Sequence, residues 1–205
     1  MSYEDLKSWQ SGLGSLFGLL AILLGALYNF RLNRKRDEKI RSDEANSVAA
    51  ALYGEILLLR KELAAIARSV SITFINWGVG KSRKGFDNNF LEINQISEPL
   101  LYKSLAPKLG LLDASLLIPI TEFYSNLQQA KLWLPLLVDK EERGVSYSPL
   151  AVLLPTRDAV QNIEETLTRI EQLLSIKQTD KTIDLGDTDA VIEMEEELFN
   201  TPNPD

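Results

Sequence analysis

The residue types that support most enzymatic chemistry are missing from this chain of 205 residues. It has no His and no Cys, so the usual zinc and haem ligand sets and the Ser-His-Asp and Cys-His catalytic arrangements are excluded. Asp and Glu number 29, but no pair has an apolar setting that would tune one as an acid and the other as a base. Glu55 and Glu122 are the acids nearest helical apolar faces, and each is interpreted as a hydrogen-bonding group that fixes helix packing. We therefore expect no catalytic residue, no cofactor, no metal and no enzymatic activity.

A glycine-rich segment, GVGKS at residues 78–82, matches a phosphate-binding loop only in part. That motif needs a Gly six residues before its Lys, where Ile75 stands, and a strand before the loop, where the pattern predicts a helix. What remains is a small basic loop containing Lys81, Arg83 and Lys84. Two interpretations stay open: the loop binds an anion or an acidic peptide, or it is a solvated connector.

The net charge of −7 is unevenly distributed. Residues 178–205 hold nine acids and one base, so residues 1–177 carry a net charge of only +1. This balance argues against binding to nucleic acid through bulk electrostatics. We predict that residues 178–205 form a disordered acidic tail, either an inert solubiliser or a segment that binds a protein partner. The apolar residues of its possible motif are Val191, Ile192, Met194, Leu198 and Phe199.

A run of 23 uncharged residues, 8–30, lies between Lys7 and Arg31. As a helix it extends about 34 Å, and a bilayer core is about 30 Å thick. Trp9 and Tyr28 stand near its two ends, where aromatic residues favour the membrane interfaces. We predict a transmembrane helix over residues 9–30, with membrane lipid as its surroundings; the alternative is a buried helix of a soluble core.

A basic collar follows the apolar run, and the residues before the run contain acids in place of a basic cluster. Positive residues favour the cytoplasmic side, and this pattern does not fit a cleaved signal peptide. The collar either sets topology alone or also contacts anionic headgroups. We expect residues 1–8 on the extracytoplasmic side of the inner membrane and residues 31–205 in the cytoplasm. The collar residues are Arg31, Arg34, Lys35 and Arg36.

Small residues recur within the predicted span at spacings of three and four. Such a stripe lets two helix backbones approach closely in lipid, although Gly is also common in membrane helices in general. Self-association through the span, or docking on another membrane helix, is one interpretation. The stripe consists of Ser11, Gly14, Gly18, Ala21 and Gly25.

The rest of the chain reads as helices. An apolar seam with spacings of four and three runs over residues 45–70, and residues 76–89 interrupt it. One or two helical turns are expected around Pro99 and Pro107, then a helix from Asp113 to about residue 138. A last helix opens at Ser148, followed by a proline, and Pro155 is expected to bend it.

These features predict an all-α chain: a transmembrane helix, a basic juxtamembrane segment over residues 31–44, an antiparallel helical bundle over residues 45–177 and the acidic tail. The 45–70 seam is interpreted as core packing within one chain. The alternative is pairing with its copy in a second subunit. The span and the 45–70 segment are not expected to form one uninterrupted coiled coil, because the small-residue stripe and the apolar seam differ in heptad phase.

AAALYGEI at 49–56 and PLLYKSLAPKLGLLDASLLIPITEFYSNL at 99–127 resemble segments of a broad group of uncharacterised bacterial single-pass membrane proteins. The resemblance covers about residues 10–130 and implies an inner-membrane location and a helical body, without a known activity. The matching positions are Leu52, Glu55, Pro99, Tyr102, Leu109, Gly110, Leu112, Phe123 and Tyr124.

The sequence thus favours a membrane-anchored scaffold, anchor or sensor whose cytoplasmic helical domain binds an unidentified protein or itself. The alternative is a membrane-acting or signalling component of a bacterial defence or prophage module, which would work through oligomerisation of the span.

Overall fold

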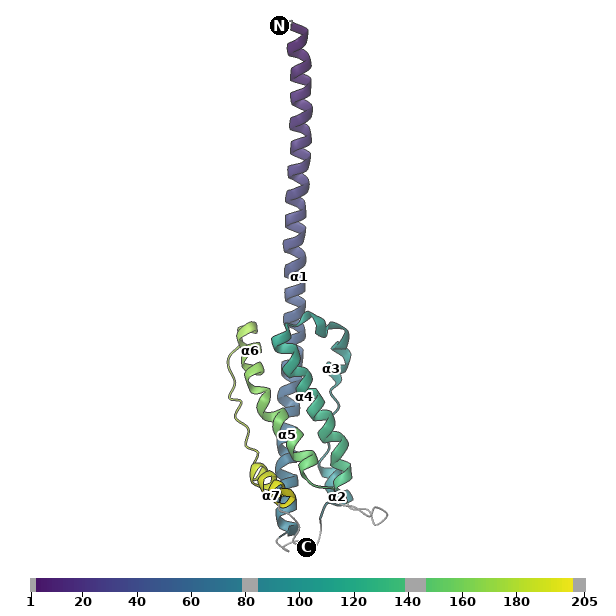
Figure 1. The fold of residues 1–205 in the computed structure, drawn as a ribbon, viewed down its shortest axis with the longest axis vertical. Coiled ribbons are helices and arrows are strands. Elements are labelled where there is room, and N and C mark those ends of the chain that lie inside the picture. Colours follow the sequence, from purple (N-terminus) through teal and green to yellow (C-terminus); the bar gives the residue numbers. More distant parts are fainter. Residues whose placement is uncertain (1–2, 79–84, 139–146, 201–205) are drawn as a thin grey trace. The chain divides into compact units, whose positions relative to one another are not determined.

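The computed structural model describes residues 3–78, 85–138 and 147–200 (Figure 1). All regular structure in these ranges is helical, which confirms the all-α prediction. The elements are α1 (Tyr3–Gly78), α2 (Asn88–Ile93), α3 (Leu100–Leu105), the 3-10 helix η1 (Ala106–Leu111), α4 (Ala114–Trp133), the 3-10 helix η2 (Leu134–Leu137), α5 (Leu150–Asn162), α6 (Glu164–Leu174) and α7 (Thr188–Asn200).

The chain divides into two compact units. The first, Met1–Ala45, consists of the N-terminal part of α1, and its described side chains are almost all exposed. The second, Asn46–Asp205, contains the rest of α1 and the other helices, and it holds the hydrophobic core.

The apolar seam of α1 forms one side of that core. From Ala49 to Val70 its members are at most 3% exposed, so the seam packs within its own chain, as predicted. Burying a Leu or Ile side chain contributes about 1.5–3 kcal/mol, which makes this seam a main source of stability. The seven residues are Ala49, Leu52, Ile56, Leu59, Leu63, Ile66 and Val70.

The other helices begin and end largely where the local sequence favours it. Asp113 caps α4, because its Oδ1 accepts a hydrogen bond from the backbone N–H of Ser115 at 2.8 Å. Ser148 Oγ accepts the N–H of Leu150 at 3.1 Å at the start of α5. α5 continues through Pro155. The predicted last helix is instead divided at Ile163, after which α6 begins. α4 packs against α5 and α6, and α5 packs against α7.

The prediction of a disordered tail over residues 178–205 is wrong for its described part. α7 forms there, and Leu185, Val191 and Ile192 are buried at 7%, 0% and 2% exposure. Residues 175–187 connect α6 to α7 along the outside of the second unit (Figure 1). The physical reason is that most of the described acids of the segment are exposed, while Leu185, Val191 and Ile192 complete the core and the one base, Lys181, is buried against Glu171.

Candidate functional site

The apolar stretch of α1 exposes its large side chains. Between Leu16 and Phe30 they are 44–71% exposed, and the most apolar 18-residue window of this helix has a mean hydropathy of 1.5 with none of it buried. A continuous apolar surface of this kind is unfavourable in water and requires lipid or protein around it. By length and composition, this helix is the one among the described residues that is apolar enough to cross a membrane.

The small-residue stripe lies on this same stretch. Gly18, Ala21 and Gly25 are exposed, and a Cβ added at Gly18 or Gly25 would meet no atom within 4 Å. Ser11 and Gly14 fall in the first part of α1, where the structure describes the helix but not the side chains. The described part of the stripe is therefore open to a second helix.

The basic collar continues α1 as exposed helix. Arg31, Arg34, Lys35 and Arg36 are all exposed. Arg34 Nε donates to Glu38 Oε1 at 3.0 Å across one helical turn, an exposed pair that contributes little to stability. The side chains of these cations are therefore accessible, and exposed cations of this kind can interact with anionic groups such as lipid headgroups.

In the second unit, Glu55 connects α1 to α3 and α4. Its Oε1 accepts the backbone N–H of Leu101 at 2.7 Å, and its Oε2 accepts the N–H of Tyr102 at 2.9 Å and the Tyr124 hydroxyl at 2.7 Å. A helix start has N–H groups without intrahelical partners and favours negative charge, so the carboxylate replaces the missing cap of α3. The predicted packing role of Glu55 is confirmed.

Two tyrosines complete this connection. The rings of Tyr102 and Tyr124 stack with centroids 3.8 Å apart. Burial and the hydrogen bond to Glu55 raise the pKa of Tyr124, so its hydroxyl stays protonated and donates at any physiological pH. Glu55, Tyr102 and Tyr124 thus form one structural contact between α1, α3 and α4. Glu122, the other acid considered, is exposed.

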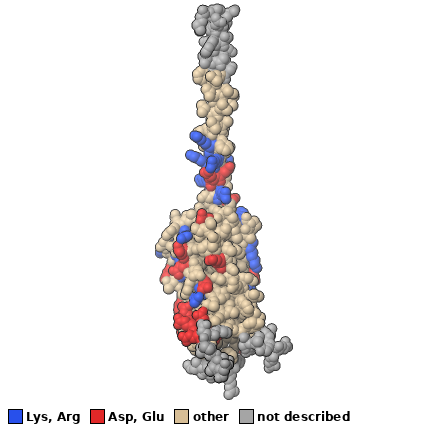
Figure 2. Space-filling view, viewed as in Figure 1, with Lys and Arg blue, Asp and Glu red and all other residues tan. Residues whose placement is uncertain are grey.

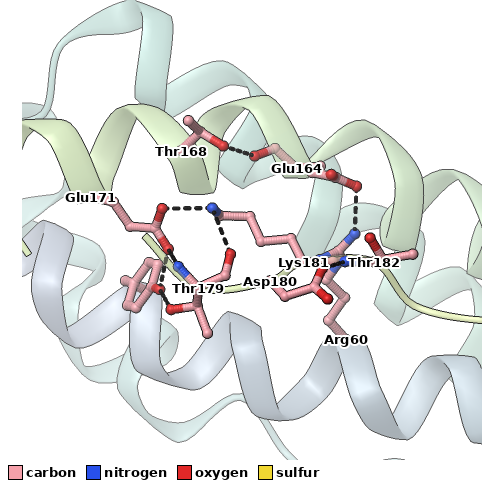
Figure 3. A network of polar contacts seen from close by, with 9 residues as sticks. Arg60, Glu164, Thr168, Glu171, Thr179, Asp180, Lys181 and Thr182 are labelled. Atoms are coloured by element: carbon pink, nitrogen blue, oxygen red, sulfur yellow. Dashed lines mark hydrogen bonds and ion pairs between the residues drawn. The ribbon is translucent and has the colours of Figure 1, made fainter. Parts of the chain in front are cut away.

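A second polar network fastens the C-terminal segment to α1 (Figure 3). Arg60 is 1% exposed, and each of its three guanidinium nitrogens donates a hydrogen bond: Nε to Val160 O at 2.6 Å, Nη1 to Lys181 O at 2.8 Å and Nη2 to Glu164 Oε2 at 3.1 Å. Burial lowers the pKa of Arg60, and Glu164 opposes that shift. One buried side chain thus joins α1, the end of α5, the start of α6 and the connector.

Glu171 is the acceptor at the centre of this network. It accepts from Lys181 Nζ at 2.5 Å, Tyr53 OH at 2.6 Å and the Thr179 N–H at 3.1 Å (Figure 3). Burial raises the pKa of Glu171, but these three donors outweigh that effect, so the pKa lies below its ordinary value. In the described ranges, no buried side-chain nitrogen or oxygen lacks a hydrogen-bond partner. The local sequence does not indicate this network, because the contacts that Tyr53 and Arg60 of α1 make in it join residues at least 100 positions apart in the chain.

The predicted tail motif is divided by the fold. Val191 and Ile192 lie in the core, whereas Met194 and Leu198 are 48% and 65% exposed, and the side chain of Phe199 lies outside the described part. The acids Asp187, Asp189, Glu193, Glu196 and Glu197 are exposed, and red atoms gather over the α7 end in Figure 2. Only the outer face of α7 therefore remains for a partner.

The basic loop residues Lys81, Arg83 and Lys84 lie outside the described residues. Within residues 16–77, 85–138 and 147–198, no three acidic side chains are grouped as a metal site.

Comparison with models of protein families, with curated proteins and with solved structures finds no match to this chain.

Proposed function

We propose that this protein is a single-pass inner-membrane protein with its N-terminus outside and a cytoplasmic helical bundle that binds other proteins or itself, as an anchor, scaffold or sensor without catalysis. The observation that carries the proposal is the continuous exposure of large apolar side chains from Leu16 to Phe30. The uncharged length of 23 residues and the basic collar that follows support both the span and its direction.

The anchor is tested by alkaline carbonate extraction of membranes that contain the full chain. We expect the protein to stay in the membrane pellet, and the double variant Leu20→Arg/Leu23→Arg to move to the supernatant, because each Arg at the helix centre costs about 2.5–3.5 kcal/mol. The matched control is Leu132→Arg/Leu173→Arg, two exposed positions of α4 and α6. Extraction of the unaltered chain into the supernatant would contradict the proposal.

The direction is tested with reporters fused after residue 205. A cytoplasmic reporter such as a fluorescent protein should be active and a periplasmic phosphatase inactive. Replacing Arg31, Arg34, Lys35 and Arg36 by Gln should weaken this bias, because the positive-inside preference depends on these cations. An active phosphatase on the unaltered chain would reverse the proposed topology.

A second candidate function is a membrane-acting or signalling component of a defence or prophage module, and the open small-residue face at Gly18 and Gly25 favours it. Gly18→Ile should then abolish dimerisation of the span in a membrane two-hybrid assay, while Leu19→Ile, its neighbour, should leave it unchanged. Overexpression should also collapse the membrane potential, whereas a scaffold leaves the potential intact.

A further inference from the structure

The outer face of α1 in the second unit is not covered by any described helix. Opposite the buried seam, five exposed residues follow each other at spacings of four, three, four and seven, so they share one face of the helix. Leu58 is 65% exposed and Ile72 is 52% exposed on this face. We call it the outer seam, and it consists of Gly54, Leu58, Lys61, Ala65 and Ile72.

One extended segment borders the outer seam with acids. Tyr53 contacts Thr179, Arg60 binds the Lys181 carbonyl and Arg68 binds the Asp184 carbonyl, so residues 179–187 run along α1 in the same direction as the helix. Lys181 is buried and paired with Glu171, so the exposed charges of this segment are Asp180, Asp184 and Asp187. Residues 179–187 form the acidic flank.

On the opposite border, residues 97–108 and Lys131 carry three bases and one acid, and the α1 carboxylates beside them, Glu55 and Glu62, accept backbone N–H groups. Ser97 binds Glu62, and Leu101 and Tyr102 bind Glu55, so residues 97–108 run back along α1. Glu98 pairs with both Lys103 and Lys131, which hold its pKa at about 2, and Lys108 adds a further exposed cation. We call residues 97–108 with Lys131 the basic flank; Figure 2 shows blue atoms along the edge where Figure 1 places α3.

We propose that the outer seam binds a second copy of this chain, with the two α1 helices parallel. A two-fold axis along the helices places the acidic flank of each copy against the basic flank of the other, as opposite edges meet in a parallel coiled coil. A two-fold axis across the helices would instead place acidic flank against acidic flank. Because like charges facing each other disfavour association, the charge pattern selects the parallel arrangement.

The composition of the outer seam fits this occupant. Gly54 and Ala65 permit close approach of two helices, and Leu58 and Ile72 supply apolar area. Leu100 and Leu101, at the start of α3 beside Glu55, are 70% and 44% exposed and extend that area. Lys61 can bury its methylene chain in the seam while its ammonium reaches toward the partner's acidic flank. This inference rests on the proposed function in one respect: two copies anchored in one membrane with the same topology are already parallel.

The test is disulfide cross-linking of the full chain in its own membranes, for which the chain offers a background without cysteine. Single variants Gly54→Cys, Leu58→Cys, Ala65→Cys and Ile72→Cys are oxidised and separated on non-reducing gels. The controls are Ser125→Cys on α4 and Gln172→Cys on α6, both exposed. We expect all four seam variants to give at least fivefold more cross-linked dimer than the controls, because each residue of a parallel pair faces its own copy.

Two outcomes would overturn the proposal. Equal cross-linking at the seam and control positions would show that the outer seam is not the dimer interface. Cross-linking at only one of the four seam positions would exclude the parallel arrangement. Adding Leu58→Glu to Ala65→Cys should lower the dimer yield at least fivefold, whereas adding Ile118→Glu, at an exposed site of α4, should not. Carbonate extraction of the same membranes separates the membrane anchor from the dimer. Protein that stays in the pellet but does not cross-link would refute pairing through the outer seam and leave the anchor intact.

Discussion

The Lys181 ammonium donates a hydrogen bond to the Glu171 carboxylate at 2.5 Å, with both side chains buried in the second unit. This pair joins the connector to α6, and Tyr53 extends the contact to α1. It therefore holds the acidic C-terminal segment on the helical body, and the stability of that segment depends on it.

Lys181→Met should release the segment. Removal of one partner from a buried ion pair costs about 3–5 kcal/mol, because the remaining charge has lost its compensation. We expect hydrogen exchange of the α7 amides to accelerate by at least a hundredfold in the full chain in detergent micelles. Lys177→Met, on an exposed lysine of the same connector, is the matched control. Unchanged exchange in Lys181→Met would show that the pair does not hold the segment.

The attachment of the segment should depend on pH. The pKa of Glu171 is lower in the folded chain than its ordinary value of 4.5, so its carboxylate contributes stability above that value. This contribution is lost as the pH falls below about 4.5 toward the folded pKa, where the carboxylate takes up a proton. The free energy of opening of α7, from hydrogen exchange, should decrease on acidification. Glu171→Gln should be less stable at pH 7 and show a flatter acid dependence; a decrease in stability on raising the pH from 5 to 8 would have the wrong sign.

Tyr124→Phe should weaken the connection between α1, α3 and α4. It removes one hydrogen bond to the Glu55 carboxylate while the two backbone donors remain, and a hydrogen bond to a charged group contributes about 1.5–3 kcal/mol. We expect a loss near the lower end of this range in urea unfolding. Tyr102→Phe keeps the ring stack and should change stability by less than about 0.5 kcal/mol. Equal effects of the two variants would show that the hydrogen bond from the Tyr124 hydroxyl to Glu55 does not stabilise the connection.

Two glycines should respond in opposite directions to replacement by Ala. Gly186 has φ +59° and a Cβ there would lie 3.1 Å from Arg68 Cγ, so Gly186→Ala should cost at least about 1 kcal/mol. Gly54 lies within α1 with no atom of its own chain near its Cβ position, so Gly54→Ala should stabilise the helix of the monomer by about 0.5–1 kcal/mol. Thermal unfolding of the full chain in micelles measures both. A gain in stability for Gly186→Ala would contradict the close approach of the connector to α1.

Local sequence features predicted much of the fold. The alternation of apolar residues at three and four determined which side of α1 faces the core, since a helix returns to the same face with that period. Asp113 caps α4, and Ser148 Oγ accepts the N–H of Leu150 at the start of α5, because a side-chain oxygen before a helix can accept one of its first free N–H groups. These are interactions between neighbours in the chain, which sequence reasoning can assess directly.

The C-terminal segment shows why the rest was not predictable. Its acids outnumber its bases nine to one, and composition alone indicated disorder. Whether Leu185, Val191 and Ile192 remain in solvent depends on the presence of a surface that they can cover, and that surface is formed by distant helices. Likewise, nothing local to Arg60 indicates burial, because Val160 and Lys181, which supply its acceptors, approach only after the chain has folded.

The sequence by itself determined the helical class, the apolar stretch, the charges that follow it and the inward face of α1, because these depend on side chains within a few turns of each other. Only the tertiary structure decided that residues 179–198 belong to the body, that Glu171 is a buried anchor, and that Leu58 and Ile72 remain uncovered. Pairing across a hundred residues requires the entropy of chain closure to be offset by many contacts at once, and no single segment contains that information.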